Sequence, residues 1–174
     1  MTKEKRIEAF DSLISEHISS YCYQWLVDNG FFTAPASVKF HRNYEGGLFD
    51  HSYAVTKTLL KLTKDNKLTW ENNRSPYIVG MFHDLCKIDA YVPLYSSGFG
   101  YNNKILLNGH GEKSIILLQK FMDLAEEEML CIRWHMGAYD NKDNWDILGR
   151  AIEKYQNVLW THTADMVAAR VLKV

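Results

Sequence analysis

The sequence predicts an all-α domain, a bundle of about six to seven helices. Apolar residues recur every three or four positions through nearly every long segment of the 174-residue chain, which is the spacing of one helix face. Prolines number only three, and no repeat, low-complexity tract or linker divides the sequence. Because a chain of this length can bury one sizeable core, we expect a single domain over residues 1–174.

The first elements follow from these apolar positions. Residues 3–28 predict a helix, and Gly30 is a plausible stop signal. Residues 31–47 lack helical spacing and predict an irregular connection. A second helix is expected over 48–64, and a third over 76–87, which begins with a proline, a residue that suits the first helical turn.

The segment 91–107 is the least helical part of the chain. Two short aromatic or β-branched runs flank "SSGFG" there, which predicts a small hairpin or an ordered loop. Helical spacing returns afterwards and predicts helices over about 112–123, 125–136 and 145–172, the last either long or broken.

Charge and cysteine content restrict the classes of function. Lys and Arg total 20 and Asp and Glu total 21, so no basic excess could hold a long polyanion, although a local pocket for a small anion remains open. The three cysteines are widely spaced without a CxxC, as expected for free thiols in a reducing cytoplasm. The apolar runs are too short to cross a bilayer, so we expect a soluble, cytoplasmic protein with no membrane partner.

Polar residues in apolar helix stripes point to the chemistry. The doublet His83 and Asp84 stands in the apolar run "YIVGMFHDLCK", where an unpaired buried carboxylate would cost several kcal/mol. Helical spacing turns four more residues inward: His51, His110, His135 and Asp165. A single inward histidine is usually a core residue bonded to a carbonyl. Five helices that each turn a histidine or aspartate inward favour a metal centre.

The order of these six residues resembles the HD superfamily of metal-dependent phosphohydrolases, an all-helical fold with a His, a His-Asp doublet and a distal Asp. The likeness spans residues 41–165. "FHDLCK" looks like the doublet with its frequent downstream lysine. The stretch "PASVKFHRNYEGGLFDH" (35–51) is similar to HD domains of bacterial 3′–5′ exonucleases and of some conjugation proteins.

The resemblance implies a role for each ligand. The first metal would be held by His51, His83, Asp84 and Asp165, with Asp84 bridging, and the second by His110 and His135. Some relatives with two metals have another histidine beside the fourth-block one, where this chain has Met136, so the second ion would keep more water. One or two ions of Fe, Mn, Co, Ni or Zn suit such mixed ligands.

Four residues are candidates for substrate binding: Lys87, His41, Arg42 and His162. Lys87 lies one turn after the doublet and is expected to contact a phosphate, or else to be a solvated helix end. His41 and Arg42 precede the "GGL" turn and would contact substrate or lie in an exposed loop. His162 lies one turn before the distal aspartate. It would support a ligand, contact the leaving group, or make a core hydrogen bond.

Together these residues predict a metal-dependent phosphohydrolase with Asp84 and Lys87 as catalytic residues. Two ions about 3.5–4 Å apart acidify a shared water and clamp phosphate oxygens. Near-neutral charge favours a small nucleotide or short oligonucleotide as substrate. One alternative is a 3′–5′ nuclease on single-stranded nucleic acid, although the chain has no basic tail or nucleic-acid module. An alternative of another class is a metal-bound nucleotide sensor without turnover, which the complete ligand set disfavours.

Overall fold

The computed structural model describes residues 1–38, 43–95 and 98–174, and these residues form a mainly helical body. They contain eight α-helices: α1 Lys3–Ile14, α2 Ser20–Asp28, α3 Gly47–Asn66, α4 Ser75–Phe82, α5 His110–Leu118, α6 Glu126–Trp134, α7 Trp145–Lys154 and α8 Asn157–Met166. The expected all-α class is therefore confirmed. None of the helices in these described segments is long and apolar enough to cross a bilayer.

Two breaks bring the number of α-helices in the described residues to eight, one more than the six to seven expected, because the break in the last segment was one of the expected alternatives and the break in the first was not. The segment 3–28 is interrupted at Ile18, whose backbone is extended (φ −131°, ψ 159°), and the side chain of Ser19 then caps the first turn of α2. The segment 145–172 is interrupted at Tyr155, which is also extended (φ −134°, ψ 99°). Both interruptions are set by one or two residues inside an otherwise helical pattern.

The third helix ends earlier than the apolar pattern predicts. α4 stops at Phe82, with His83 as its C-cap, and the chain continues through Asp84 into a 3₁₀-helix, η2 Leu85–Asp89. A 3₁₀-helix has about three residues per turn and therefore aligns side chains three positions apart. Lys87 accordingly pairs with the residue three positions before it, rather than sharing a face with the histidine four positions before it.

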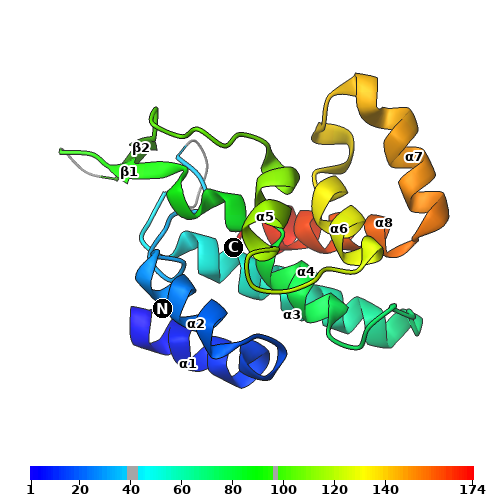
Figure 1. The fold of residues 1–174 in the computed structure, drawn as a ribbon, viewed down its shortest axis with the longest axis horizontal. Coiled ribbons are helices and arrows are strands. Elements are labelled where there is room, and N and C mark those ends of the chain that lie inside the picture. Colours follow the sequence, from blue (N-terminus) through cyan, green and yellow to red (C-terminus); the bar gives the residue numbers. More distant parts are fainter. Residues whose placement is uncertain (39–42, 96–97) are drawn as a thin grey trace.

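The expected hairpin within 91–107 is present. β1 Tyr91–Pro93 pairs antiparallel with β2 Phe99–Tyr101, and the hairpin projects from one side of the helical body (Figure 1). In this view α3, α4 and α8 lie near the centre, α1 and α2 at one end, and α7 at the other (Figure 1). The C-terminus lies at the centre, close to the helices that carry the predicted ligands.

An apolar core and a close helix contact hold the end of α4 in place. Phe10, Phe31 and Phe82 are fully buried and pack with ring centroids 5.9–6.3 Å apart. Gly80 allows α3 and α4 to approach closely, because a Cβ at that position would lie 2.7 Å from the Cα of Thr56. The residues that follow Phe82 are therefore fixed against α3.

A buried ion pair fixes the start of α3. The guanidinium of Arg6, whose residue is 4% exposed, donates to both carboxylate oxygens of Asp50 at 2.9 and 3.0 Å. This pair joins α1 to the first turn of α3. It lies one residue before His51, so the same contact positions a predicted metal ligand.

Candidate metal centre

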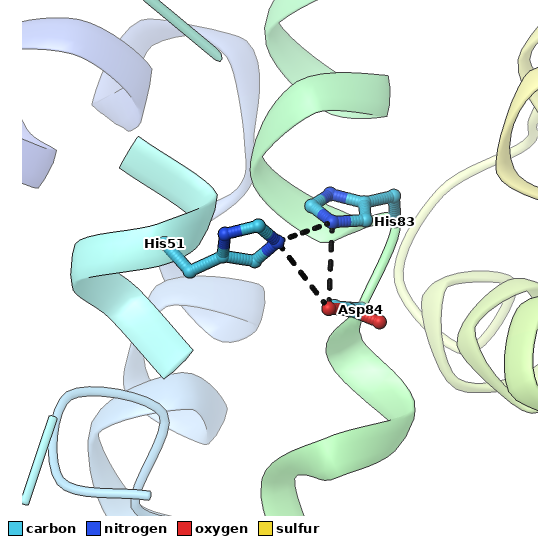
Figure 2. Close-up of side chains that lie close together, drawn as sticks. All are labelled: His51, His83 and Asp84. Atoms are coloured by element: carbon cyan, nitrogen blue, oxygen red, sulfur yellow. Dashed lines mark hydrogen bonds and ion pairs between the residues drawn. The ribbon is translucent and has the colours of Figure 1, made fainter. Parts of the chain in front are cut away.

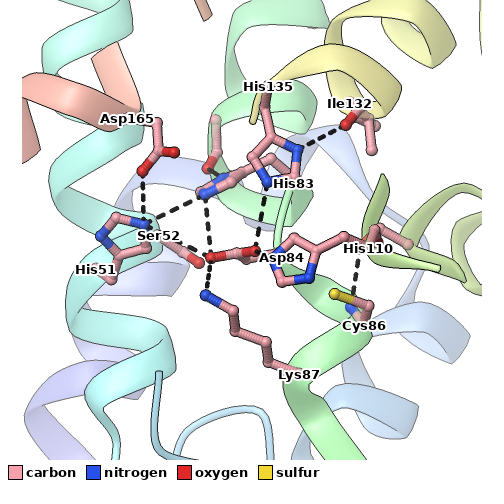
Figure 3. Close-up of polar contacts among 12 residues, drawn as sticks. His51, Ser52, His83, Asp84, Cys86, Lys87, His110, Ile132, His135 and Asp165 are labelled. Carbon is pink, nitrogen blue, oxygen red and sulfur yellow. Dashed lines mark hydrogen bonds and ion pairs between the residues drawn. The ribbon is translucent and has the colours of Figure 1, made fainter. Parts of the chain in front are cut away.

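The six predicted ligands gather in one cluster where five helices meet (Figure 3). They are His51 from α3, His83 and Asp84 from the end of α4, His110 at the start of α5, His135 at the end of α6, and Asp165 near the end of α8. Most of them come from helix ends, where the chain can turn a side chain toward a shared centre. The convergence expected from helical spacing is therefore present in the structure.

Asp84 lies at the centre of the cluster and is 2% exposed. Its Oδ2 is 3.6 Å from Nε2 of His51 and 3.5 Å from Nε2 of His83 (Figure 2). Its Oδ1 is 2.9 Å from Nε2 of His110 and 3.5 Å from Nε2 of His135 (Figure 3). The two oxygens of one carboxylate thus face two different pairs of histidines.

A second carboxylate lies on one side of this arrangement. Oδ1 of Asp165 is 3.0 Å from Nε2 of His51. The Nε2 atoms of His51 and His83 are themselves only 3.3 Å apart. The side with His51 and His83 therefore holds two imidazole nitrogens and oxygens from two carboxylates. It offers more donor atoms than the side with His110 and His135, which has one carboxylate.

Backbone carbonyls fix the proton position on three of the histidines. The Nδ1–H groups of two rings face peptide carbonyls, in the pairs His83 with Gly80 (2.9 Å) and His135 with Ile132 (2.7 Å). That of His51 faces a main-chain oxygen of the last residue, Val174 (3.1 Å), which likewise only accepts. Because a carbonyl oxygen only accepts, Nδ1 must carry the proton, and Nε2 of a neutral ring is then a lone pair. Three lone pairs consequently point toward the carboxylate of Asp84.

Such a set of acceptors needs a cation. Nε2 of His135 and Oδ1 of Asp84 are buried and make no hydrogen bond of normal geometry with the described residues. Ligand atoms lie within 4.8 Å of one another in three groups: His51, His83 and Asp84; His83, His135 and Asp165; and Asp84, His110 and His135. Imidazole and carboxylate donors in this number fit a divalent transition metal.

The protonation of the metal-free cluster follows from burial and charge. Burial alone would raise the pKa of Asp84, but the Lys87 ammonium and the surrounding imidazoles lower it well below its ordinary value. Burial lowers the pKa of His51 and of His135. Burial acts in the same direction on His83, but the charge of Asp84 outweighs it and raises the pKa of that ring. Burial also acts to lower the pKa of His110, but its hydrogen bond to Asp84 outweighs burial and raises that pKa to about 10. Without an ion, Lys87 and a protonated His110 therefore balance the buried carboxylate.

Lys87 lies on the central carboxylate. Its Nζ is 2.6 Å from Oδ2 of Asp84, and its side chain is 16% exposed (Figure 3). It is therefore not a solvated helix end. The early end of α4 explains this position, because the 3₁₀ turn directs the lysine back toward the doublet.

The other candidate substrate contacts have different outcomes. Nδ1 of His162 is 2.7 Å from the carbonyl oxygen of His135, and its ring packs on Gly137. His162 therefore makes a core hydrogen bond, one of the three roles expected for it. It supports the turn that carries His135, and it is not among the residues that line the cavity beside the cluster. His41 and Arg42 lie outside the described residues.

A cavity of about 420 Å³ opens onto the cluster. His51, Asp84, His110, Asp165 and Lys87 contribute to its wall, together with Tyr91, Tyr101 and Tyr139. A neighbouring cavity of about 680 Å³ shares Lys87, Tyr91, Tyr101 and His110 with it. A ligand larger than a single phosphate can therefore reach the predicted metal ligands.

Two cavity residues were missed in the sequence. Arg170 and Lys173 line the cavity beside Met166 and Ala169. These four positions have the spacing of one helix face, and they follow directly after Asp165. The inward stripe of the last helix, extended past its aspartate, reaches Ala169 and Leu172 instead, so helical spacing did not indicate the two cations. The π-helix over Val167–Leu172 departs from that spacing.

Comparison with known proteins gives a partial match. Over 72 residues the chain is 39% identical to the dihydroneopterin 2′,3′-cyclic phosphate phosphodiesterase of Methanocaldococcus jannaschii. The match covers 38% of this chain and 29% of that protein, so the chain spans less than a third of this relative. No protein-family model and no solved structure matches the chain. The likeness and the cluster together fit a phosphohydrolase, and membership of the HD superfamily stays a prediction.

Proposed function

We propose that this chain is a metal-dependent hydrolase that cleaves a phosphoester or phosphoanhydride bond of a small nucleotide or a short oligonucleotide. One observation carries the proposal: the two oxygens of Asp84 face two pairs of histidines at the wall of a cavity large enough for a nucleotide-sized ligand. The phosphodiesterase named above acts on a cyclic phosphate, which supports a phosphodiester as the bond that this site cleaves.

The donor set divides naturally between two ions. Asp84 would bridge them, with His51, His83 and Asp165 on one side and His110 and His135 on the other. Bound divalent ions would supply a water nucleophile at neutral pH and would neutralise the phosphate charge. The carbonyl partners of the three buried rings hold the Nε2 lone pairs toward the centre before any ion arrives.

Lys87 has the position of a phosphate contact. Its ammonium carries three donors, so it can keep its hydrogen bond to Asp84 and still donate to a phosphate oxygen in the cavity. We expect this contact to strengthen as negative charge builds on the phosphate during the reaction. Such a charge-assisted contact contributes about 2–3 kcal/mol, or roughly a hundredfold in rate.

The experiment measures metal content and phosphate release on the same preparations. Protein purified without chelators is analysed for metals and supplied with Mn²⁺, Fe²⁺, Co²⁺, Ni²⁺ or Zn²⁺. A panel then includes 2′,3′- and 3′,5′-cyclic nucleotides, mononucleotides and dinucleotides. We expect hydrolysis of at least one small phosphoester. A protein that neither retains nor takes up these metals contradicts the proposal.

A matched pair of variants tests the centre itself. Asp84→Asn removes the charge proposed to bridge the ions. Asp89→Asn removes a carboxylate at the end of η2 that pairs with Lys113 of α5, outside the ligand cluster. We expect only Asp84→Asn to lose metal and hydrolysis. Equal metal content in the two variants would contradict the assigned centre.

The same panel separates the two alternatives. A nuclease would degrade single-stranded nucleic acid in preference to mononucleotides, with a rate that falls steeply as salt rises. A sensor would bind a nucleotide in its metal-loaded form and leave it intact. Turnover of a small nucleotide that varies little with salt supports the hydrolase over both.

A further inference from the structure

The wall of the cavity continues past the ligand Asp165 into an unusual helical segment. After α8 ends, residues Val167–Leu172 form a π-helix, η5. Short π-helical turns are rare and occur often at functional sites. Arg170 in this segment and Lys173 just after it both line the cavity. The last part of the chain thus adds two cations to the site.

Both cations are exposed residues at the cavity wall. The cavity wall contains two carboxylates, Asp84 and Asp165, and both face the histidines of the cluster. Among the described residues, neither Arg170 nor Lys173 forms an ion pair with a carboxylate, whereas Arg133 pairs with two. The pair therefore offers positive charge to whatever enters the cavity.

An aromatic ring helps to place the arginine. The guanidinium of Arg170 lies 5.9 Å from the ring centroid of Tyr139, which also lines the cavity. A guanidinium near an aromatic face keeps its five N–H donors available for a planar or tetrahedral anion. Lys173 adds a point charge beside it, and this combination suits a phosphate group.

The pair lies on a different element from Lys87, the cation that contacts the cluster. Lys87 already serves the metal side from η2, whereas Arg170 and Lys173 approach from the α8 side. A ligand that carries two anionic groups suits both regions.

We infer that Arg170 and Lys173 form a second anion subsite, which binds a phosphate other than the one that is cleaved. The inference rests on the proposed hydrolase function and narrows its substrate to a phosphoester that carries a second phosphate. That group is either the terminal 5′-phosphate of a mononucleotide or a backbone phosphate of a short oligonucleotide.

The first test is binding, which does not depend on turnover. Calorimetry on Mn²⁺-loaded protein compares adenosine 3′-phosphate with adenosine 3′,5′-bisphosphate, which differ only in the second phosphate. We expect the bisphosphate to bind about tenfold more tightly, the size of one charge-assisted contact at a partly exposed site. The double variant Arg170→Ala with Lys173→Ala should reduce this preference to about twofold or less.

Matched variants exclude a general charge effect. Arg150→Ala removes an exposed cation that does not line the cavity, and it should leave the preference unchanged. Arg170→Gln keeps a long polar side chain and should lower the preference as Arg170→Ala does. The subsite is overturned if wild-type protein binds the two compounds equally. It is also overturned if the double variant still binds the bisphosphate as selectively as wild type.

Kinetics then identify the source of the second phosphate. Adenosine 2′,3′-cyclic phosphate is compared with its 5′-phosphorylated form and with a dinucleotide that ends in the same cyclic phosphate. If the 5′-phosphorylated form has the higher kcat/KM, the subsite binds a terminal phosphate. If the dinucleotide has the higher kcat/KM, the subsite binds a backbone phosphate. If the bisphosphate binds more tightly but no compound is hydrolysed, the subsite is supported and the proposed hydrolase function is contradicted. If the two compounds bind equally and a substrate is hydrolysed, the subsite is refuted and the hydrolase function is not.

Discussion

Replacing Lys87 with methionine should destabilise the metal-free protein much more than the loaded one. The change keeps the length of the side chain and removes only the ammonium that lies 2.6 Å from Oδ2 of Asp84. Asp84 is 2% exposed, so its carboxylate would lose its nearest full positive charge without gaining water. A bound metal ion would supply the missing charge.

The magnitude follows from the burial of the pair. Removing one partner of a buried ion pair costs about 3–5 kcal/mol, and we take the lower end, about 3 kcal/mol, because the lysine is partly exposed. For a chain of this size, each kcal/mol shifts the melting temperature by about 2–4 °C. We therefore expect Lys87→Met to melt about 6–12 °C below wild type in chelator.

Thermal unfolding followed by circular dichroism measures this difference with chelator and with Mn²⁺. Lys61→Met is the control, because Lys61 pairs with Asp65 on the exposed face of α3, where such pairs contribute at most about 1 kcal/mol. With Mn²⁺, the deficit of Lys87→Met should shrink to less than half. If the two variants melt together in chelator, Lys87 does not compensate the buried charge of Asp84, and the reasoning is refuted.

Three further predictions use other features of the site and the core. Lys87→Ala should lower phosphate release about a hundredfold and leave the metal content unchanged, whereas Asp84→Ala should lose both. Elemental analysis and the activity assay on the same preparations check this. Full activity of the lysine variant would contradict it. Gly137→Ala should lower the unfolding free energy by about 2 kcal/mol, because the backbone there has φ +54° and a Cβ would lie 2.5 Å from a neighbouring imidazole ring; unchanged denaturant midpoints would contradict this reading. Burial raises the pKa of Cys22 to about 11 and also raises that of Cys131, so both thiols should be alkylated slowly at pH 8 in native protein and rapidly in urea, as peptide mass spectrometry would show. Fast alkylation of either thiol in the native state would mean that the core opens locally.

The helical period of the sequence located the residues of the cluster because the backbone stays helical slightly beyond the helices. His83 and His135 are C-caps, but their backbones are still right-handed helical, at φ −53° and ψ −36° and at φ −57° and ψ −28°. A pattern read from the preceding turns therefore still gives their direction correctly. The prediction of six converging residues depended on this local regularity.

A local helix cap and contacts between distant segments explain what the sequence pattern did not indicate. The hydroxyl of Ser19 starts a new helix inside a continuous apolar stripe, and no periodicity marks such a cap. Glu127 lies in the acidic first turn of α6 but is 3% exposed, because it accepts hydrogen bonds from the backbone of Glu71 and the amide of Asn157. The charge of Glu127 alone would predict an exposed residue. It is buried because α6 packs against the segments that carry Glu71 and Asn157.

The hydrogen bonds within the last turns of α4 and α6 have a consequence for how the proposed centre would acquire an ion. His83 and His135 each donate to a carbonyl three residues earlier in their own helix, so the helix itself sets the orientation of the ring. Donors that are oriented in this way accept an ion after the fold is complete, and they do not need a particular ion in order to form. Because affinity alone separates the first-row ions poorly, supply then decides which one is bound. The metal recovered with this protein should therefore change with the growth medium of the cells that produce it.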